Sequence, residues 1–161
     1  MTPTETLNIM NSYLDNLRYA KKHSAYVGLP KDKVGGEVYG DGNTVIKIGA
    51  IHEYGKRSFL REPLNTKKKD ILGTIDNQWK AIFEKGKDAK DALEIIGVKA
   101  TNISKGAFTT LGYGKWEPIT DATLAWRKWR SKNSGIKYST QTMIDTGLLR
   151  SSITWSVRRD S

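Results

Sequence analysis

The segment whose residues most suggest catalysis is Met143-Ile144-Asp145-Thr146-Gly147. Two apolar residues before Asp-Thr-Gly is how retroviral-type aspartic proteases present their catalytic carboxylate, and two such aspartates, one per subunit, share a proton and activate water. That fold needs most of its sheet after the motif, whereas only 16 residues follow Asp145 here. The alternative interpretation is that Asp145 or Thr146 caps a short helix over 147–152 and accepts backbone N–H groups. We favour the cap and predict that the protein is not an enzyme.

Metal, thiol and phosphate chemistry find less support. His52-Glu53 matches the first half of a zinc-protease motif, but that motif needs a second histidine at position 56, which is Lys56. We therefore expect His52 to be a hydrogen-bonded structural residue. Residues 112–115 (GYGK) lack the strand and the spacing of a P-loop, and the chain contains no cysteine. We predict no metal site and no cofactor.

A basic and aromatic segment, Trp126-Arg127-Lys128-Trp129-Arg130, has the composition that stacks nucleic-acid bases and neutralises phosphates. Trp126 and Trp129 are three residues apart and so share one helix face. They could equally be core or interface anchors, with the cations extending outward to water. We favour this packing interpretation.

The net charge of +10 favours acidic partners but says nothing of the fold. Residues 115–161 hold nine Lys/Arg and four Asp/Glu, which is half of that net charge. A basic face in the C-terminal third and an ordinary solvated surface explain this excess equally well. No apolar run is long enough to span a bilayer, and residues 1–20 do not have the pattern of a signal peptide. We expect no membrane partner.

The first third of the chain predicts a helix followed by two strands. Apolar residues recur at three- and four-residue steps from Thr4, a candidate N-cap, to Lys22. Apolar and small or polar residues then alternate over 24–29, and a second strand is predicted over Thr44–Ile48. The Gly-rich segment Lys31–Asn43 between them is predicted to be a long, mobile hairpin loop.

The rest of the chain predicts mainly helices. Apolar residues follow a helical period over 66–85 and 88–111, with a break at Gly86, and a further helix begins at the cap Thr120 and reaches about Arg130. Ile153, Trp155 and Val157 alternate with polar residues as in a strand. Three strands and several helices without a βαβ order predict an α+β fold, a small antiparallel sheet against helices in one domain over 1–161. We expect flexibility at residues 158–161.

Two pairs of segments resemble a family of phage proteins. The first pair is 48–55 (IGAIHEYG) with 58–63 (SFLREP), and the second is 116–120 (WEPIT) with 143–154 (MIDTGLLRSSIT). In this order they resemble the virion-morphogenesis, tail-completion, tail-terminator and neck proteins of tailed bacteriophages. Two prolines of the family pattern are missing, before Phe59 and at position 143, where Met143 stands.

The resemblance implies an α+β structural protein without enzymatic activity. It implies a homo-oligomeric ring, commonly a hexamer, at the head-proximal end of the tail, where it ends the tail tube or joins tail to head. Its partners would be further copies of itself, the tail tube protein and the neck or head-completion proteins, first in the host cytoplasm during assembly and then in the virion.

Two regions are candidates for the interfaces of such a ring. One is the loop, with Lys31, Asp32, Lys33 and Tyr39. The other is the basic and aromatic helix together with the C-terminal end; its candidate residues are Trp126, Arg127, Trp129, Arg130, Arg158 and Arg159. The alternative function is a nucleic-acid-binding module that uses the basic C-terminal third and contacts phage DNA.

Overall fold

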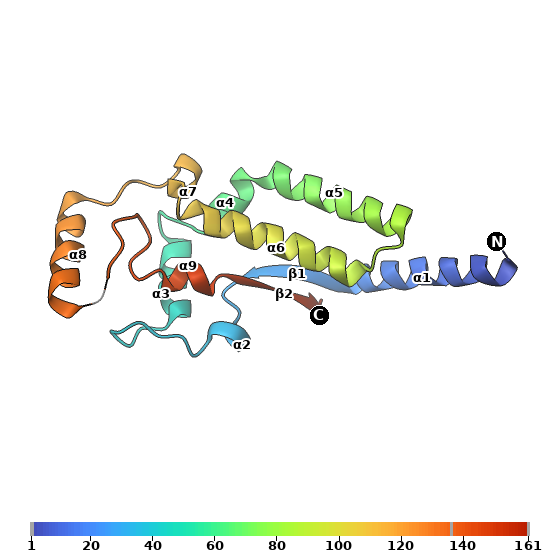
Figure 1. The fold of residues 1–161 in the computed structure, drawn as a ribbon, viewed down its shortest axis with the longest axis horizontal. Coiled ribbons are helices and arrows are strands. Elements are labelled where there is room, and N and C mark those ends of the chain that lie inside the picture. The colour runs from blue at the N-terminus through green and yellow to red at the C-terminus, as the bar shows by residue number, and fades with distance from the viewer. Residues whose placement is uncertain (1, 136, 161) are drawn as a thin grey trace.

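A helical hairpin lies against a small sheet in the centre of the molecule. The computed structural model describes residues 2–135 and 137–160. Helices α5 (Lys68–Lys85) and α6 (Ala89–Ala107) form the hairpin, and α6 packs on both strands (Figure 1). The contact is close at Gly97, where a Cβ atom would lie 3.1 Å from the Trp155 side chain. The predicted α+β class is confirmed.

The two strands come from opposite ends of the chain. Strand β1 (His23–Gly28) pairs antiparallel with β2 (Thr154–Arg159), so that Ala25 faces Val157 and Val27 faces Trp155. Beyond the strand, the Asp160 N–H donates to the Lys22 carbonyl at 2.8 Å. Residues 158–160, where we expected flexibility, are therefore held to the N-terminal third, and Ser161 lies outside the described residues.

The predicted strand at Thr44–Ile48 is wrong. These residues enter helix α3 (Val45–Tyr54), which Thr44 caps by accepting the Lys47 N–H at 3.2 Å. Val45 and Gly49 are four residues apart and both are buried, so the apolar run serves one face of a helix. The partner of β1 is instead β2, and the sheet has two strands within the described residues.

The segment Lys31–Asn43 is more structured than a hairpin loop. Its start forms helix α2 (Lys31–Val34), and Val38 makes an isolated antiparallel bridge with Thr44. The Ser152 hydroxyl donates to the Glu37 carboxylate, which ties the segment to the C-terminal part of the chain.

The main core lies between α3, the C-terminal part of α6 and three short helices, α4 (Arg61–Thr66), α7 (Leu111–Gly114) and α9 (Leu148–Ser152). Phe59, Phe108 and Trp116 are nearly fully buried, and the last two rings meet edge to face with centroids 5.5 Å apart. The buried residues of this core are Val45, Phe59, Ala107, Phe108, Trp116, Leu149 and Ile153. A smaller cluster of Ile82, Ala89 and Ala92 closes the far end of the hairpin.

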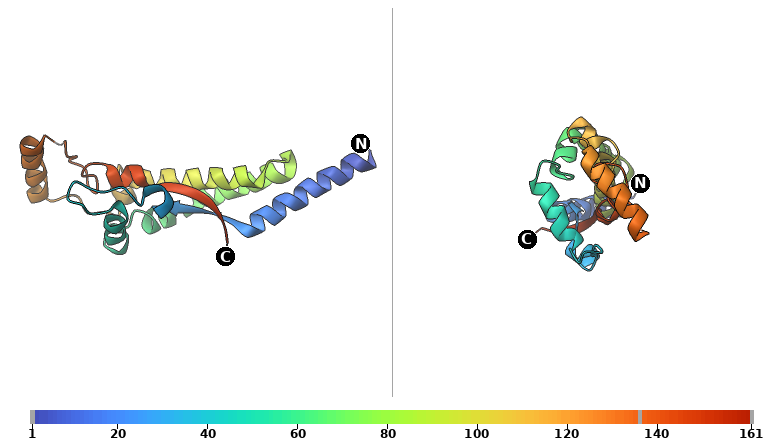
Figure 2. Two further views of the ribbon diagram at one scale, coloured as in Figure 1. Left: turned by 90° about the horizontal axis from the view of Figure 1, so that it is seen from below. Right: turned by 90° about the vertical axis from the view of Figure 1, so that its left-hand side faces the viewer.

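Two helices project from this body at opposite ends, α1 (Pro3–Lys22) and α8 (Asp121–Ser134) (Figures 1 and 2). Neither helix, both wholly within the described ranges, has a buried residue. The cap of α1 is Thr2 rather than Thr4, because Thr2 and Glu5 exchange side-chain and backbone hydrogen bonds. Helix α8 begins at Thr120 as predicted. No helix in the described part of the chain is both long and apolar enough to cross a membrane.

Candidate interaction surfaces

Glu53 joins the two segments of the first motif pair. Its Oε1 accepts the Ser58 hydroxyl at 2.8 Å and the Arg61 N–H at 3.0 Å. Its Oε2 accepts the N–H groups of Phe59 at 3.1 Å and Leu60 at 2.9 Å. The carboxylate thus satisfies the free backbone donors at the start of α4 and holds Phe59 in the core. Sequence alone offered only half of a metal motif at His52-Glu53 and no role for the glutamate, which in the structure makes these structural contacts.

Trp116 connects the second motif pair to the first. Its indole Nε1 donates to the Ser58 carbonyl at 3.2 Å, and its ring is buried beside Phe108. Two residues further on, the Pro118 carbonyl accepts the Arg57 guanidinium at 3.4 Å. The segments of the resemblance, far apart along the chain, therefore meet in one core.

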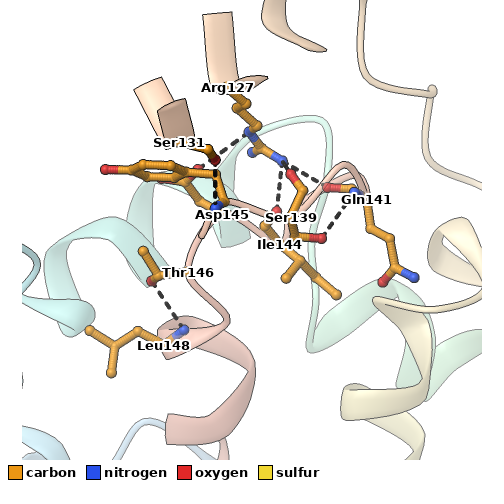
Figure 3. A network of polar contacts seen from close by, with 9 residues as sticks. Arg127, Ser131, Ser139, Gln141, Ile144, Asp145, Thr146 and Leu148 are labelled. Carbon is orange, nitrogen blue, oxygen red and sulfur yellow. Dashed lines mark hydrogen bonds and ion pairs between the residues drawn. The ribbon is translucent and has the colours of Figure 1, made fainter. Parts of the chain in front are cut away.

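Arg127 organises the loop that precedes α9 (Figure 3). Its Nη1 donates to the carbonyls of Ser139, Gln141 and Ile144 at 2.9, 2.9 and 2.6 Å, and its Nε lies 3.3 Å from Asp145 Oδ1. Only 12% of the Arg127 side chain is exposed. This cation, predicted to extend outward into an interface, is instead the tether between α8 and residues 139–145.

The Asp145-Thr146-Gly147 segment caps α9 only in part as we expected. The Asp145 carboxylate faces Arg127 and does not cap α9, so this part of the prediction is wrong. Thr146 Oγ1 accepts the Leu148 N–H at 3.4 Å (Figure 3). Gly147 is the N-cap residue with φ of 87°, a left-handed conformation that favours glycine.

The predicted loop and tail residues come together on one surface. The Asp32 carboxylate lies 2.7 Å from the Arg158 guanidinium, and Lys33 Nζ donates to the Trp155 carbonyl at 2.7 Å. Lys31 and Arg159 are exposed nearby, on α2 and at the end of β2. These contacts attach α2 to β2, whereas the sequence grouped Arg158 and Arg159 with the basic helix.

Helix α8 carries its two tryptophans outside. Trp126 is 49% and Trp129 63% exposed, so the interpretation of these residues as core anchors is wrong. The Arg130 guanidinium lies 4.9 Å from the ring centres of both Trp126 and Tyr138. Helix α8 therefore has an exposed face with two aromatic rings and cations.

Tyr39, the remaining loop candidate, lies apart from Lys31–Lys33. It lines a pocket of about 260 Å³ with His52, Arg57, Trp126 and Asp145 among others. Burial raises the pKa of Tyr39, and burial together with the Arg57 charge lowers the pKa of His52. Among the residues that the structure describes, no three His, Cys, Asp or Glu side chains gather as metal ligands.

The apolar stripe of α1 was visible in the sequence but was not among our candidate sites. Leu7, Met10, Leu14 and Leu17 are 40–59% exposed. We used their spacing only to predict an amphipathic helix.

Comparison with protein-family models, with curated proteins and with solved structures gave no match.

Proposed function

We propose that this chain is a structural assembly protein of a tailed bacteriophage, which forms a ring at the head-proximal end of the tail. In that ring it ends the tail tube, enables head joining, or does both. The resemblance of the two motif pairs suggests this function. The observation that carries it in the structure is the pair of exposed apolar helix faces at opposite ends of the molecule, on α1 and α8.

Rings need two different patches on each subunit, because a head-to-tail contact repeats until it closes. The stripe on α1 is a candidate for one of these patches. The tryptophan face of α8 is a second exposed surface, open to a tail or neck protein, and neither helix contributes a buried residue to the body. Exposed apolar clusters of this kind mark partner surfaces in soluble proteins.

Electron microscopy of tails assembled with and without the chain tests this function. Tubes of excessive or variable length in its absence support a terminating role, and tails of normal length that fail to join heads support a completion role. Normal tails and full infectivity without the chain would contradict the proposal. The mass of the purified protein in solution gives the size of any ring.

A second candidate function is nucleic-acid binding by α8. Trp126 and Trp129 are exposed beside Lys128, Arg130 and Lys132, the combination that stacks on bases and neutralises phosphates. Phage DNA passing through a ring would bring such a face close to phosphates.

Fluorescence anisotropy with a labelled duplex, measured over a range of salt concentrations, separates the two candidates. Binding by α8 predicts a steep salt dependence whose slope falls by about 0.9 for each cation removed, for example in Lys128→Ala. Lys90→Ala, a change on α6, is the matched control. The absence of binding at physiological salt excludes the nucleic-acid function and leaves ring assembly unaffected.

A further inference from the structure

One face of helix α1 contacts the α5–α6 hairpin of its own chain. The Tyr13 hydroxyl donates to the Phe83 carbonyl at 2.9 Å, and the Asn16 side chain accepts the Ala89 N–H at 2.7 Å. Tyr19 and Ala20 pack against the buried cluster at the end of the α5–α6 hairpin. These contacts fix the C-terminal half of α1, while its N-terminal half extends past the body (Figure 2).

A second face of α1, the α1 stripe, is largely left exposed by the part of the chain that the structure describes. It consists of Leu7, Met10, Leu14 and Leu17, which follow each other at steps of three, four and three residues. This is the a/d spacing of a helix that packs along another element. With 3.6 residues per turn, the stripe lies roughly a third of a turn away from the face that holds Tyr13 and Asn16. The four side chains are 40–59% exposed.

An apolar groove lies at the base of the same helix. It encloses about 240 Å³ between the end of α1, the start of β1 and the α5–α6 hairpin. Its walls are mostly apolar, with Ile75, Trp79, Ile82, Leu93 and Ile96 from the hairpin. Pockets for drug-sized ligands start at about 300 Å³, so this groove suits aliphatic side chains better. The exposed Phe83 ring stacks on Trp79 and extends the apolar wall.

The stripe of a chain cannot enter the groove of that same chain. Ala20 already lines the groove, and at 1.5 Å per residue Leu7 lies about 20 Å and Leu14 about 9 Å further along a continuous helix. Helix α1 runs from β1 past the end of the α5–α6 hairpin (Figures 1 and 2). The two surfaces also match in length, since the stripe spans about 15 Å and the α5 wall from Ile75 to Phe83 about 12 Å.

We propose that the α1 stripe of one subunit docks into the groove between β1 and the α5–α6 hairpin of a second copy of this chain. The contact joins two different patches and leaves a free stripe and a free groove at the two ends of every pair. When each pair of copies shares one such contact, it extends head to tail, as a ring requires. This inference rests on the proposed ring assembly and identifies the surfaces that make the ring.

Photo-crosslinking from the stripe tests the contact directly. Met10 is 55% exposed, so replacing it with the photoreactive p-benzoylphenylalanine leaves the body intact. Protein labelled with ¹⁴N and protein labelled with ¹⁵N are mixed, irradiated and digested, and mass spectrometry identifies the peptides that join the two labels. We expect joined peptides from residues 75–96, which line the groove.

Two results would overturn the inference. Joined peptides from residues 3–22 would mean that two α1 helices pair symmetrically, and the absence of joined peptides would mean that the stripe contacts no second copy. Either result leaves the proposed function open to its own test, because tails lacking the chain are examined separately. Crosslinks to the groove combined with normal tails in the absence of the chain would uphold this contact and contradict the phage function.

A charge in the stripe provides a second measurement. Leu14→Glu should reduce the assembled fraction at least tenfold in native mass spectra, because a carboxylate would enter an apolar groove. The matched control is Leu72→Glu on α5, a leucine of the same exposure, 47% against 45%, that does not line the groove. Equal assembly of the two variants would contradict the contact, provided that circular dichroism shows both folded.

Discussion

Helices α6 and α8 differ in where their apolar side chains lie: those of α6 are mostly buried or half-buried, whereas the tryptophans of α8 are exposed. Helix α6 buries seven residues and packs on both strands, on α5 and on α1. Helix α8 buries none and exposes two tryptophans, and it is attached to the loop before α9 by Arg127. Arg130 on the Tyr138 ring and the Ser131 hydroxyl, which accepts the Tyr138 N–H, add to this attachment. Burial of apolar surface is the main stabilising term in folding. We therefore expect α8 to contribute little to the stability of the body, and the apolar residues of α8 and α1 named above stay exposed.

The largest effect is expected from truncating a core ring. Phe59→Ala should cost about 3–5 kcal/mol of unfolding free energy, because Phe59 is 1% exposed and its removal leaves a cavity. Trp129→Ala on α8 should change stability by no more than about 0.5 kcal/mol. Urea unfolding measures both. A comparable loss in the two variants would remove the distinction between body and projecting helix.

The next effect concerns the Glu53 network inside the body. Glu53→Gln should cost about 1–3 kcal/mol, because an amide presents one acceptor oxygen to four donors that a carboxylate serves with two. Glu117→Gln, a change of the same size at an exposed position, should be neutral. Equal urea midpoints for Glu53→Gln and wild type would show that the network does not hold α4.

A smaller and more local effect is expected at the tether of α8. Arg127→Lys should cost about 1–2 kcal/mol, since a lysine cannot reproduce the planar set of donors that reaches three carbonyls and Asp145. Hydrogen exchange should accelerate in residues 139–145 and not in α6. Arg18→Lys, at an exposed ion pair, is the control and should have no measurable effect. Faster exchange throughout the body would contradict a local role.

The smallest effect is a pH dependence. Because burial lowers the pKa of His52, the folded protein binds this proton less tightly than the unfolded chain does. Burial of the neutral His52 ring carries no free-energy penalty above its ordinary pKa of 6.5. The free energy of unfolding decreases as the pH falls below that value, because the unfolded chain binds the proton first. His52→Gln should flatten the pH dependence of the urea midpoint in this range. Identical pH profiles for the variant and wild type would show that His52 does not contribute to the pH dependence of stability.

The parts of the fold that periodicity defines were predictable from the sequence. The helices over 66–85 and 88–111, the cap at Thr120 and the final strand are confirmed within one or a few residues. Four β-branched residues over Thr44–Ile48 favoured a strand, but the Thr44 cap and the burial of Val45 with Gly49 decide for a helix. Local pattern could not resolve this, because short apolar runs fit either structure.

The site was less predictable, because its contacts join residues far apart in the sequence. Sequence alone assigned Glu53 no role, turned Arg127 outward from its helix and made Asp145 a candidate cap. Each of the three instead makes structural contacts that depend on the tertiary fold. The exposure of α1 and α8 likewise depends on the tertiary fold, because both helices extend beyond the packed elements. A periodic apolar stripe predicts that a helix face is buried but does not specify whether its partner is the same chain.

We expect α1 and α8 to form contacts with other copies, whereas the body is fully packed within one chain. Hydrogen exchange of the full chain, measured at low and at high protein concentration, tests this expectation most directly. We predict that amides of α1 and α8 gain protection as the concentration rises, while those of α6 keep theirs. Unchanged exchange of α1 and α8 at every concentration would contradict the account.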